Sequence, residues 1–310
     1  MNRNDFILPV SIIKVQEKKL LTEQKLIKML ETNTSKEIIK ILNDTDYSYS
    51  MIGITSDEMY ENILVNETKR VYNFSREMAK DYQDIVDILA LRYEYQNLKL
   101  ILKNSKSNSN LDDLVIDTGI KNREKLDQNY NLVKNIKDKQ VSAIILDKLY
   151  FEHIYELAKK MKDFDIFTKY VKILIDKYNV VTFLRLKKQN KNIDYIENIF
   201  VENGNISKNE LIKIYDNNSS YINNFKKYSD SKVWDIFEKE QNIALIEKMY
   251  DNMVINLARD YRNVTIGPEP IFTYILAKEY EMRALRLILS SKINSINPED
   301  IKGRMRGVYV

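Results

Sequence analysis

Several residue types are absent or scarce in this chain of 310 residues, and each absence excludes a kind of structure or chemistry. There is no cysteine, so disulfides, thiolate metal sites and cysteine nucleophiles are excluded. Six glycines and four prolines are few of the residues that sheets and tight turns require, so a mostly α-helical fold follows. The glycines are scattered and form no phosphate-binding loop, which argues against an ATP site.

Long hydrophobic runs are also missing. No segment approaches the roughly 20 apolar residues that a membrane helix needs. The N-terminal segment "MNRNDFILPVSIIKVQEKK" lacks the apolar core and the small-residue cleavage site of a secretory signal peptide. We therefore expect a soluble chain.

The composition allows a large buried core and gives no sign of a nucleic-acid partner. Apolar residues make up 44% of the chain and charged residues 30%, with a formal net charge of +4. Charges of both signs are interleaved instead of forming a basic tract, so nucleic-acid binding is not indicated. The length allows one large domain or two to three packed subdomains.

Helix starts are the clearest local signals. Ser207 with Glu210 three residues later is typical of a capping box, and Asn297 before Pro298 is typical of a capped first turn. Thr22 begins "TEQKLIKMLE" in the same way. Clusters of turn-forming residues predict breaks at 103–110, 202–205, 215–224 and 266–271.

An internal repeat is visible when three helical segments are aligned without gaps. The segments are "EYQNLKLILK" (94–103), "DKYNVVTFLR" (176–185) and "KEYEMRALRL" (278–287). Each places two polar side chains three residues apart: Glu94 and Asn97, Asp176 and Asn179, Lys278 and Glu281. This recurrence predicts three related helical subdomains, with repeats of roughly 1–120, 121–215 and 216–310 in a single domain over 1–310.

The recurring polar pairs allow two interpretations. Residues three apart share one face of a helix, so the pairs can be local hydrogen-bonded pairs that stabilise by only ~0.2 to 0.5 kcal/mol. Alternatively, they line a shared cavity. Spacing favours the local interpretation for each pair alone, and their recurrence keeps the second open.

In the segment "YILAKEYEMRALRLILSSK" (274–292), five charged residues interrupt the helical pattern before the final lysine: Lys278, Glu279, Glu281, Arg283 and Arg286. Its apolar positions form a normal core face, and Glu279, Arg283 and Arg286 lie together beside that face. Glu279 and Arg283 have the spacing of an exposed ion pair, which stabilises by of order 0.5 kcal/mol. Taken alone, the charges predict a solvated stripe.

Candidates for catalysis are few. His153, the one histidine, is not accompanied by a cysteine or by a serine in a nucleophile motif. It is better interpreted as a surface or packing residue. Trp234, the one tryptophan, lies in a segment with helical periodicity and is expected to anchor the core.

The C-terminal "KGRMRGVYV" gathers Lys302, Arg304 and Arg306. Bases at the end of a helix interact favourably with its own dipole, and this is the simpler interpretation. A contact with an acidic protein partner or with anionic lipid is the alternative.

Four stretches of the sequence resemble one known family. The last, "GPEPIFTYILAKEYEMRALRLILSSKINSINPEDIKGRMRGVYV" (267–310), is similar to the C-terminal signature of the stalk component named C in bacterial and archaeal V-type ATPases, equivalent to the component named d in eukaryotic V-ATPases. The others are "KKLLTEQKLIKMLE" (18–31), "LDKLYFEHIYELAKK" (146–160) and "YVKILIDKYNVVTFLRLK" (170–187). Together they cover nearly the whole chain.

The resemblance implies an all-α fold of three similar helical subdomains in a pseudo-threefold funnel. It also implies a non-catalytic rotor subunit that couples the central stalk, made of the D and F subunits, to the membrane ring of proteolipid subunits. That rotor subunit transmits torque for proton or sodium transport. It would have no cofactor, metal site, nucleic-acid partner or small-molecule substrate, and would lie peripherally at the cytoplasmic face of the membrane, where the membrane stator is a further partner.

Seven residues are hypothesised to bind partners. Those that recur in the repeats, Asn97, Asn179 and Glu281, are expected near the pseudo-axis. The bases Arg283, Arg286, Arg304 and Arg306 are expected to contact partner subunits. The alternative function is a helical-repeat adaptor or RNA-binding scaffold, which would need a continuous basic groove and salt-sensitive binding. A helical hydrolase would need a clustered acid, base or metal set that the sequence does not offer.

Overall fold

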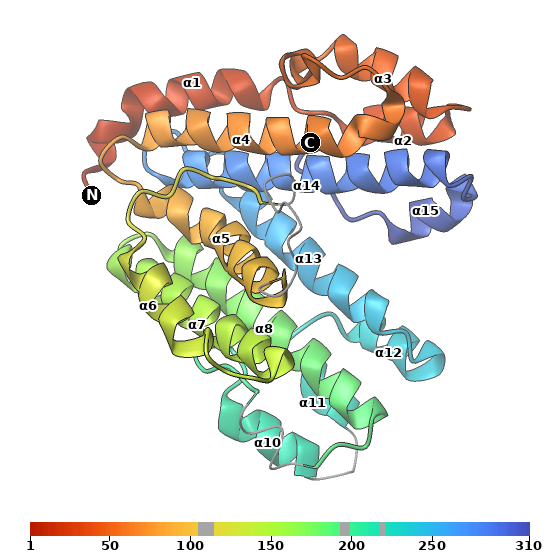
Figure 1. Ribbon diagram of the computed structural model, residues 1–310. Coiled ribbons are helices and arrows are strands. Elements are labelled where there is room, and N and C mark those ends of the chain that lie inside the picture. The colour runs from red at the N-terminus through yellow and green to blue at the C-terminus, as the bar shows by residue number, and fades with distance from the viewer. Residues whose placement is uncertain (105–114, 193–198, 217–220) are drawn as a thin grey trace. The chain divides into compact units, whose positions relative to one another are not determined.

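The computed structural model describes residues 1–104, 115–192, 199–216 and 221–310, and within these ranges the secondary structure is helical, without a β-strand. The predicted all-α class is confirmed (Figure 1). The α-helices are α1 (Ile7–Glu17), α2 (Glu23–Glu31), α3 (Ser35–Asn43), α4 (Tyr60–Ala79), α5 (Asp84–Asn104), α6 (Glu124–Val133), α7 (Lys139–Lys160), α8 (Asp165–Lys188), α10 (Lys208–Asp216), α11 (Tyr221–Phe225), α12 (Ser231–Glu240), α13 (Ile243–Asp260), α14 (Glu269–Ile293) and α15 (Pro298–Arg304). Short 3-10 helices are η1 (Arg3–Phe6), η2 (Asp46–Met51) and η3 (Asp57–Met59).

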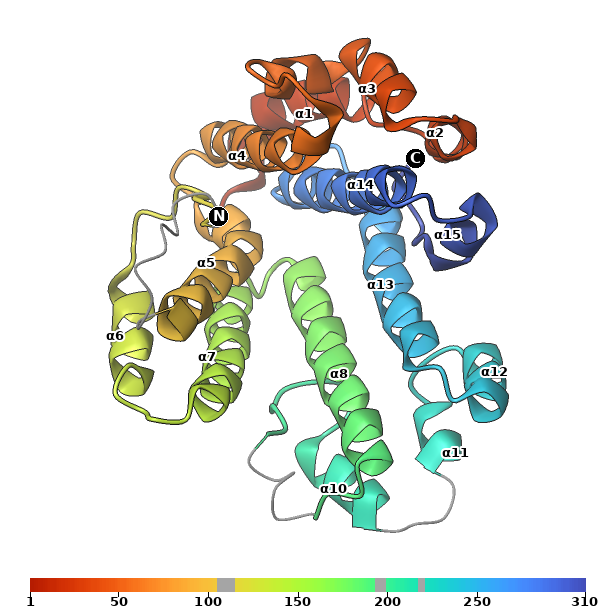
Figure 2. The ribbon, with the colours of Figure 1, turned by 45° about the vertical axis from the view of Figure 1, so that its right-hand side comes forward.

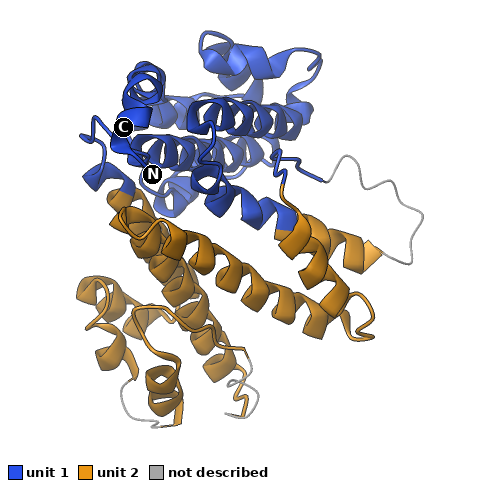
Figure 3. Cartoon of the chain, turned by 90° about the vertical axis from the view of Figure 1, so that its left-hand side faces the viewer, with its two compact units in different colours: residues 1–94, 112–121, 258–310 blue, residues 95–111, 122–257 orange. Residues whose placement is uncertain are grey.

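The chain divides into two compact units, coloured separately in Figure 3. Unit 1 comprises residues 1–94, 112–121 and 258–310, and unit 2 comprises residues 95–111 and 122–257. The prediction of three related subdomains is a finer division than these two units, and it stays a prediction.

Unit 1 is built around α14. Helices α1 and α4 pack along α14, and α2, α3 and α15 also contact it, as the layered ribbons of Figure 1 show. Its core joins apolar residues of α14, such as Leu285 and Ile288, with Leu26, Ile38 and Leu64. The longest helix of the unit is therefore also its centre.

Unit 2 contains a second core around the one tryptophan. Helix α7 packs between α6 and α8, and α10 contacts both α8 and α11 (Figure 2). Trp234 is fully buried and stacks on Phe225 with ring centroids 5.2 Å apart. The prediction of a core tryptophan is confirmed.

The three predicted helix starts are all present. The side chains of Thr22, Ser207 and Asn297 each accept a hydrogen bond from a backbone N–H of the first turn, at 3.0 to 3.2 Å. At Ser207 the reciprocal half of the capping box is replaced, because the Glu210 carboxylate accepts a hydrogen bond from the Tyr228 hydroxyl instead. Local side-chain chemistry is thus sufficient to place these helix ends.

The predicted breaks are mostly too long. The break at 266–271 ends at Pro268, since α14 begins at Glu269 and proline is compatible with a first helical turn. Within 215–224, α10 extends to Asp216 and α11 begins at Tyr221. Residues 202–205 form a bend outside the helices, so the predicted break is present there, and most of 103–110 lies outside the described residues.

Candidate functional site

The most unusual feature of unit 1 is a row of buried charges on α14. Lys278, Glu279 and Glu281 expose 4%, 1% and 2% of their surface. The prediction of a solvated stripe is therefore wrong for these residues. It assumed that charges face water, whereas α14 is covered by other helices on the sides where these charges lie.

Lys278 is the centre of the first cluster, which we call the lysine network: Lys278, Glu67, Glu281, Arg70 and Tyr47. The Lys278 Nζ lies 2.8 Å from Glu67 Oε1 and 2.5 Å from Glu281 Oε1. Arg70 binds the Glu67 carboxylate with two nitrogens at 2.7 and 2.8 Å. The Tyr47 hydroxyl donates to Glu281 Oε1 at 2.7 Å. Two acids thus face two bases, and the formal charge balances.

The second oxygen of Glu281 holds the N-terminal segment in place. The backbone N–H of Leu21 donates to Glu281 Oε2 at 2.5 Å, directly before the capping residue Thr22 of α2. The lysine network therefore joins α14, α4, η2 and the start of α2 within unit 1.

Electrostatics favour the charged forms in this network. Burial alone would raise the pKa of Glu67, but hydrogen bonds and charges from Arg70 and Lys278 outweigh burial and lower the pKa to about 2. For Lys278, burial opposes the charge, yet Glu281 and Glu67 raise its pKa above the ordinary value. Burial and the Glu281 carboxylate raise the pKa of Tyr47, which keeps its hydroxyl a donor.

Glu279 is the centre of a second cluster, which we call the Glu279 network: Glu279, Arg92, Tyr72 and Tyr93. Its Oε1 atom accepts from the Tyr72 hydroxyl at 2.6 Å and lies 2.9 Å from the Arg92 guanidinium. The Arg92 guanidinium also stacks over the Tyr93 ring at 4.6 Å. This network ties α14 to α4 and to the first part of α5.

In unit 2, the aligned residues Asp176 and Asn179 are buried as well. Asn179 exchanges two hydrogen bonds with the backbone of Val201, at 2.8 and 2.9 Å. Asp176 accepts from Ile206 N at 3.1 Å and Asn205 Nδ2 at 2.8 Å. Both side chains thus bind the segment that follows their helix, and not each other, so the interpretation as a local helix pair is wrong here.

The first aligned pair has the same burial. Asn97 exposes 6% of its surface and Glu94 exposes 2%. The Thr118 hydroxyl donates to Glu94 at 3.4 Å. All six aligned polar side chains are therefore buried.

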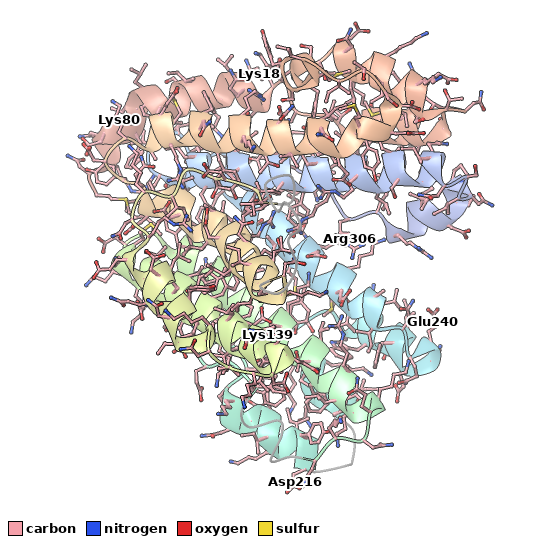
Figure 4. The ribbon with its side chains drawn as sticks, viewed as in Figure 1. Lys18, Lys80, Lys139, Asp216, Glu240 and Arg306 are labelled. Atoms are coloured by element: carbon pink, nitrogen blue, oxygen red, sulfur yellow. The ribbon has the colours of Figure 1, made fainter. Side chains whose placement is uncertain are left out.

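The four predicted arginines lie at or near the surface of unit 1. Arg286 is exposed and forms an ion pair with Glu61 at 3.0 Å, and the Arg283 guanidinium lies 4.9 Å from the centre of the Tyr280 ring. Arg304 is exposed at the end of α15, and Arg306, labelled in Figure 4, follows it and donates to the Arg304 carbonyl. Glu281 shares α14 with two of these arginines but points into the core.

His153 is a packing residue, as predicted. It exposes 9% of its surface, and its Nδ1 lies 3.2 Å from the Tyr95 hydroxyl, which also accepts from Asn129. Burial lowers the pKa of His153 to about 4. In the part of the chain that the structure describes, no three His, Asp or Glu residues are grouped to hold a metal ion, and no helix is long and apolar enough to cross a membrane.

The partners of the buried charges on α14 were missed by sequence reasoning. Glu67 occupies the same stripe of α4 as the buried residues Ile63, Leu64 and Val71, at spacings of three and four. A charged residue inside an apolar stripe was the available signal. Nothing local in the sequence connects Glu67 with Lys278.

Comparison with known proteins places these features in context. The family model described as "ATP synthase (C/AC39) subunit" matches residues 9–304. The C subunit of the V-type sodium ATPase of Enterococcus hirae is 25% identical, over 96% of this chain and 97% of its own length. The C subunit of the A-type ATP synthase of Thermococcus kodakarensis is 23% identical, over 95% and 88%, and that of Methanocaldococcus jannaschii is 23% identical, over 94% and 83%.

Proposed function

Because the chain belongs to the ATP synthase (C/AC39) subunit family, we propose that it is a non-catalytic rotor subunit of a V-type ATPase or ATP synthase. In this role it joins the central stalk, made of the D and F subunits, to the membrane proteolipid ring, at the cytoplasmic face of the membrane. The observation that carries the proposal is the extent of the similarity. The family model matches residues 9–304, and the alignment with the Enterococcus relative covers 97% of that protein. A match of this extent concerns the whole chain and not one shared motif.

The proposed mechanism is mechanical. The three repeats, roughly 1–120, 121–215 and 216–310, form the wall of a funnel-shaped socket that receives the end of the stalk, and the opposite surface rests on the ring. Rotation of the stalk is transmitted by the socket to the ring, and the turning ring transports ions. The relatives are named as a sodium ATPase and as ATP synthases, so the same part serves motors named for either direction.

A coupling subunit must resist shear, and the buried networks of α14 supply that resistance. Sliding α14 along α4 separates Lys278 from Glu67 and Glu279 from Tyr72. The first separation breaks a buried ion pair, and a buried charge that loses its partner costs about 3 to 5 kcal/mol. The second removes a hydrogen bond from the buried Glu279 carboxylate, which keeps its ion pair with Arg92. Apolar contacts alone re-form after a small slide, whereas these paired charges fit only one register.

The proposed roles of the seven predicted residues differ by their burial. Asn97, Asn179 and Glu281 are interior residues, and their proposed role is to hold the helices that wall the socket. The proposed partner contacts are the surface arginines, Arg283 and Arg286 on α14 and Arg304 and Arg306 after it. Acidic patches on the stalk or on the stator are the matching chemistry.

A pull-down with the purified D and F subunits tests the arginine contacts. The variant Arg283→Glu with Arg286→Glu reverses two charges on α14, and we expect it to lose at least about tenfold in affinity for the stalk. The matched control is Lys40→Glu with Lys69→Glu, which makes the same charge change at exposed positions of unit 1. Arg286 is paired with Glu61 within the chain. A third variant, Glu61→Lys with Arg286→Glu, therefore keeps an ion pair between these two positions but exchanges its positive and negative charges.

Equal retention of the stalk by the arginine variant and by its matched control would remove Arg283 and Arg286 from the proposed contact. Failure of the unmodified chain to retain the D and F subunits would contradict the function itself. Circular dichroism of each variant separates lost binding from lost folding.

A further inference from the structure

Unit 2 contains a cavity that plays no part in the proposed function. It lies beside the C-terminal end of α8 and has a volume of about 420 Å³. It is lined by residues from α8, α11 and α12 and from the start of α13: Leu184, Lys187, Lys188, Tyr221, Phe237, Gln241 and Ile243.

The walls of this cavity are apolar. Leu184 and Phe237 are buried members of the core around Trp234, and Tyr221 and Ile243 pack against that core from the side. Small-molecule sites in proteins have volumes of about 300 to 1,000 Å³, mostly apolar walls and a few polar groups that fix orientation. This cavity has the size and the walls of such a site.

The polar groups of the lining are donors. They are two lysines and one amide, and no carboxylate is among the described lining residues. The Lys187 Nζ donates to the Tyr215 carbonyl at 2.5 Å and lies 4.1 Å from the centre of the Tyr215 ring. These contacts fix the ammonium group in place, while Lys188 is exposed on the next position of α8.

Two acids, Asp216 and Glu238, act on residues that line this cavity. Burial lowers the pKa of Lys187, and Asp216 acts against burial. Burial and the Glu238 carboxylate raise the pKa of Tyr221. Neither Asp216 nor Glu238 lines the cavity. A half-buried lysine beside apolar walls is suited to a negatively charged group that carries an apolar chain.

We propose that this cavity binds a single-chain amphiphile with an anionic head group, a carboxylate or a phosphate, as a ligand and not as a substrate. The chain lies between Leu184, Phe237 and Ile243, and the head group pairs with Lys187 and Lys188. The site is independent of the rotor function, since it requires only the packing of unit 2.

Decanoate, kept below the concentration at which it forms micelles, is the test probe for the full-length chain. Trp234 is a built-in reporter, because its ring centroid is 5.5 Å from that of Phe237 in the cavity wall. We expect a saturable change in tryptophan fluorescence with decanoate and with decyl phosphate, and binding of uncharged decanol about tenfold weaker. The variant Lys188→Glu should reduce the affinity for decanoate by about tenfold and leave the affinity for decanol unchanged.

The matched control is Lys239→Glu, an exposed lysine on α12 that does not line the cavity, and it should bind decanoate like the unmodified chain. A second variant, Ile243→Phe, narrows the cavity without adding a second tryptophan and should weaken the binding of both probes; methyl NMR spectra then report whether unit 2 is folded. Decanol binding as tightly as decanoate, or no saturable signal with decanoate, would overturn the proposal. If decanoate gives no saturable signal, an apolar side chain of a protein partner is the occupant to test next.

Discussion

Replacing Lys278 with methionine tests the lysine network most severely. Lys278→Met keeps a long, flexible side chain of similar length but removes the ammonium that lies 2.8 Å from Glu67 and 2.5 Å from Glu281. Glu67 keeps Arg70 and Glu281 keeps the Tyr47 hydroxyl, yet one buried negative charge is left uncompensated. Removing one partner of a buried ion pair costs about 3 to 5 kcal/mol.

That loss is large against a total stability of about 5 to 15 kcal/mol. The assay is urea unfolding followed by circular dichroism at pH 7, with Lys292→Met as the matched control on the same helix, where we expect a change within about 0.5 kcal/mol. The loss should become smaller as the pH falls towards 4, because the Lys278 ammonium is one of the groups that lower the pKa of Glu67. Without it, the Glu67 carboxylate takes up a proton at higher pH, and protonation removes the uncompensated charge.

Two results would refute this reasoning. A loss below about 1 kcal/mol at pH 7 means that the ammonium is not needed to balance the acids. A loss that does not depend on pH means that the damage comes from packing and not from charge.

Unit 2 offers two further predictions and a comparison with unit 1 offers a third, all measured by denaturant unfolding with Trp234 fluorescence and circular dichroism. Gly204→Ala should destabilise unit 2 by about 1 to 3 kcal/mol, because a Cβ at this position would collide with Asp176 Oδ1. Gly303→Ala in unit 1 should be near neutral, because a Cβ there would have no atom within 4 Å. Equal effects of the two substitutions on stability would contradict this. Burial raises the pKa of Asp176 from 3.8 to about 6, so the folded state binds more protons between these values, and stability should fall by about 3 kcal/mol as the pH rises from about 4 to 6 and then level off. A slope that persists in Asp176→Asn would assign the effect to another group. Asn179→Ala should cost about 1 to 3 kcal/mol, because the buried backbone N–H and carbonyl of Val201 lose their partner, and a neutral result would mean that water replaces it.

The features that sequence reasoning predicted correctly are those that depend on near neighbours. Thr22, Ser207 and Asn297 begin helices because each side chain binds an N–H two or three residues away. The burial of Trp234 follows from helical periodicity. These inferences need no knowledge of which helices meet.

The buried charges of α14 could not be predicted in the same way. Tyr47, which donates to Glu281, is 234 residues away in the chain, and Tyr72, which donates to Glu279, is 207 residues away. Pattern reasoning assigns charges to the solvent unless a partner is known. Glu281 is close to Lys278 in sequence, but the partners on other helices are not. The repeat alignment was nevertheless informative, because it singled out positions whose polar side chains are all buried.

The coupling of ATP hydrolysis to ion transport tests the central claim most directly. Vesicles reconstituted with the complete motor and with a motor that lacks this chain are compared for ATP hydrolysis and for ATP-driven ion uptake. If the chain joins stalk to ring, the motor without it still hydrolyses ATP but takes up no ions, and adding back the purified chain restores uptake. Ion uptake at the full rate per ATP without this chain would contradict the account.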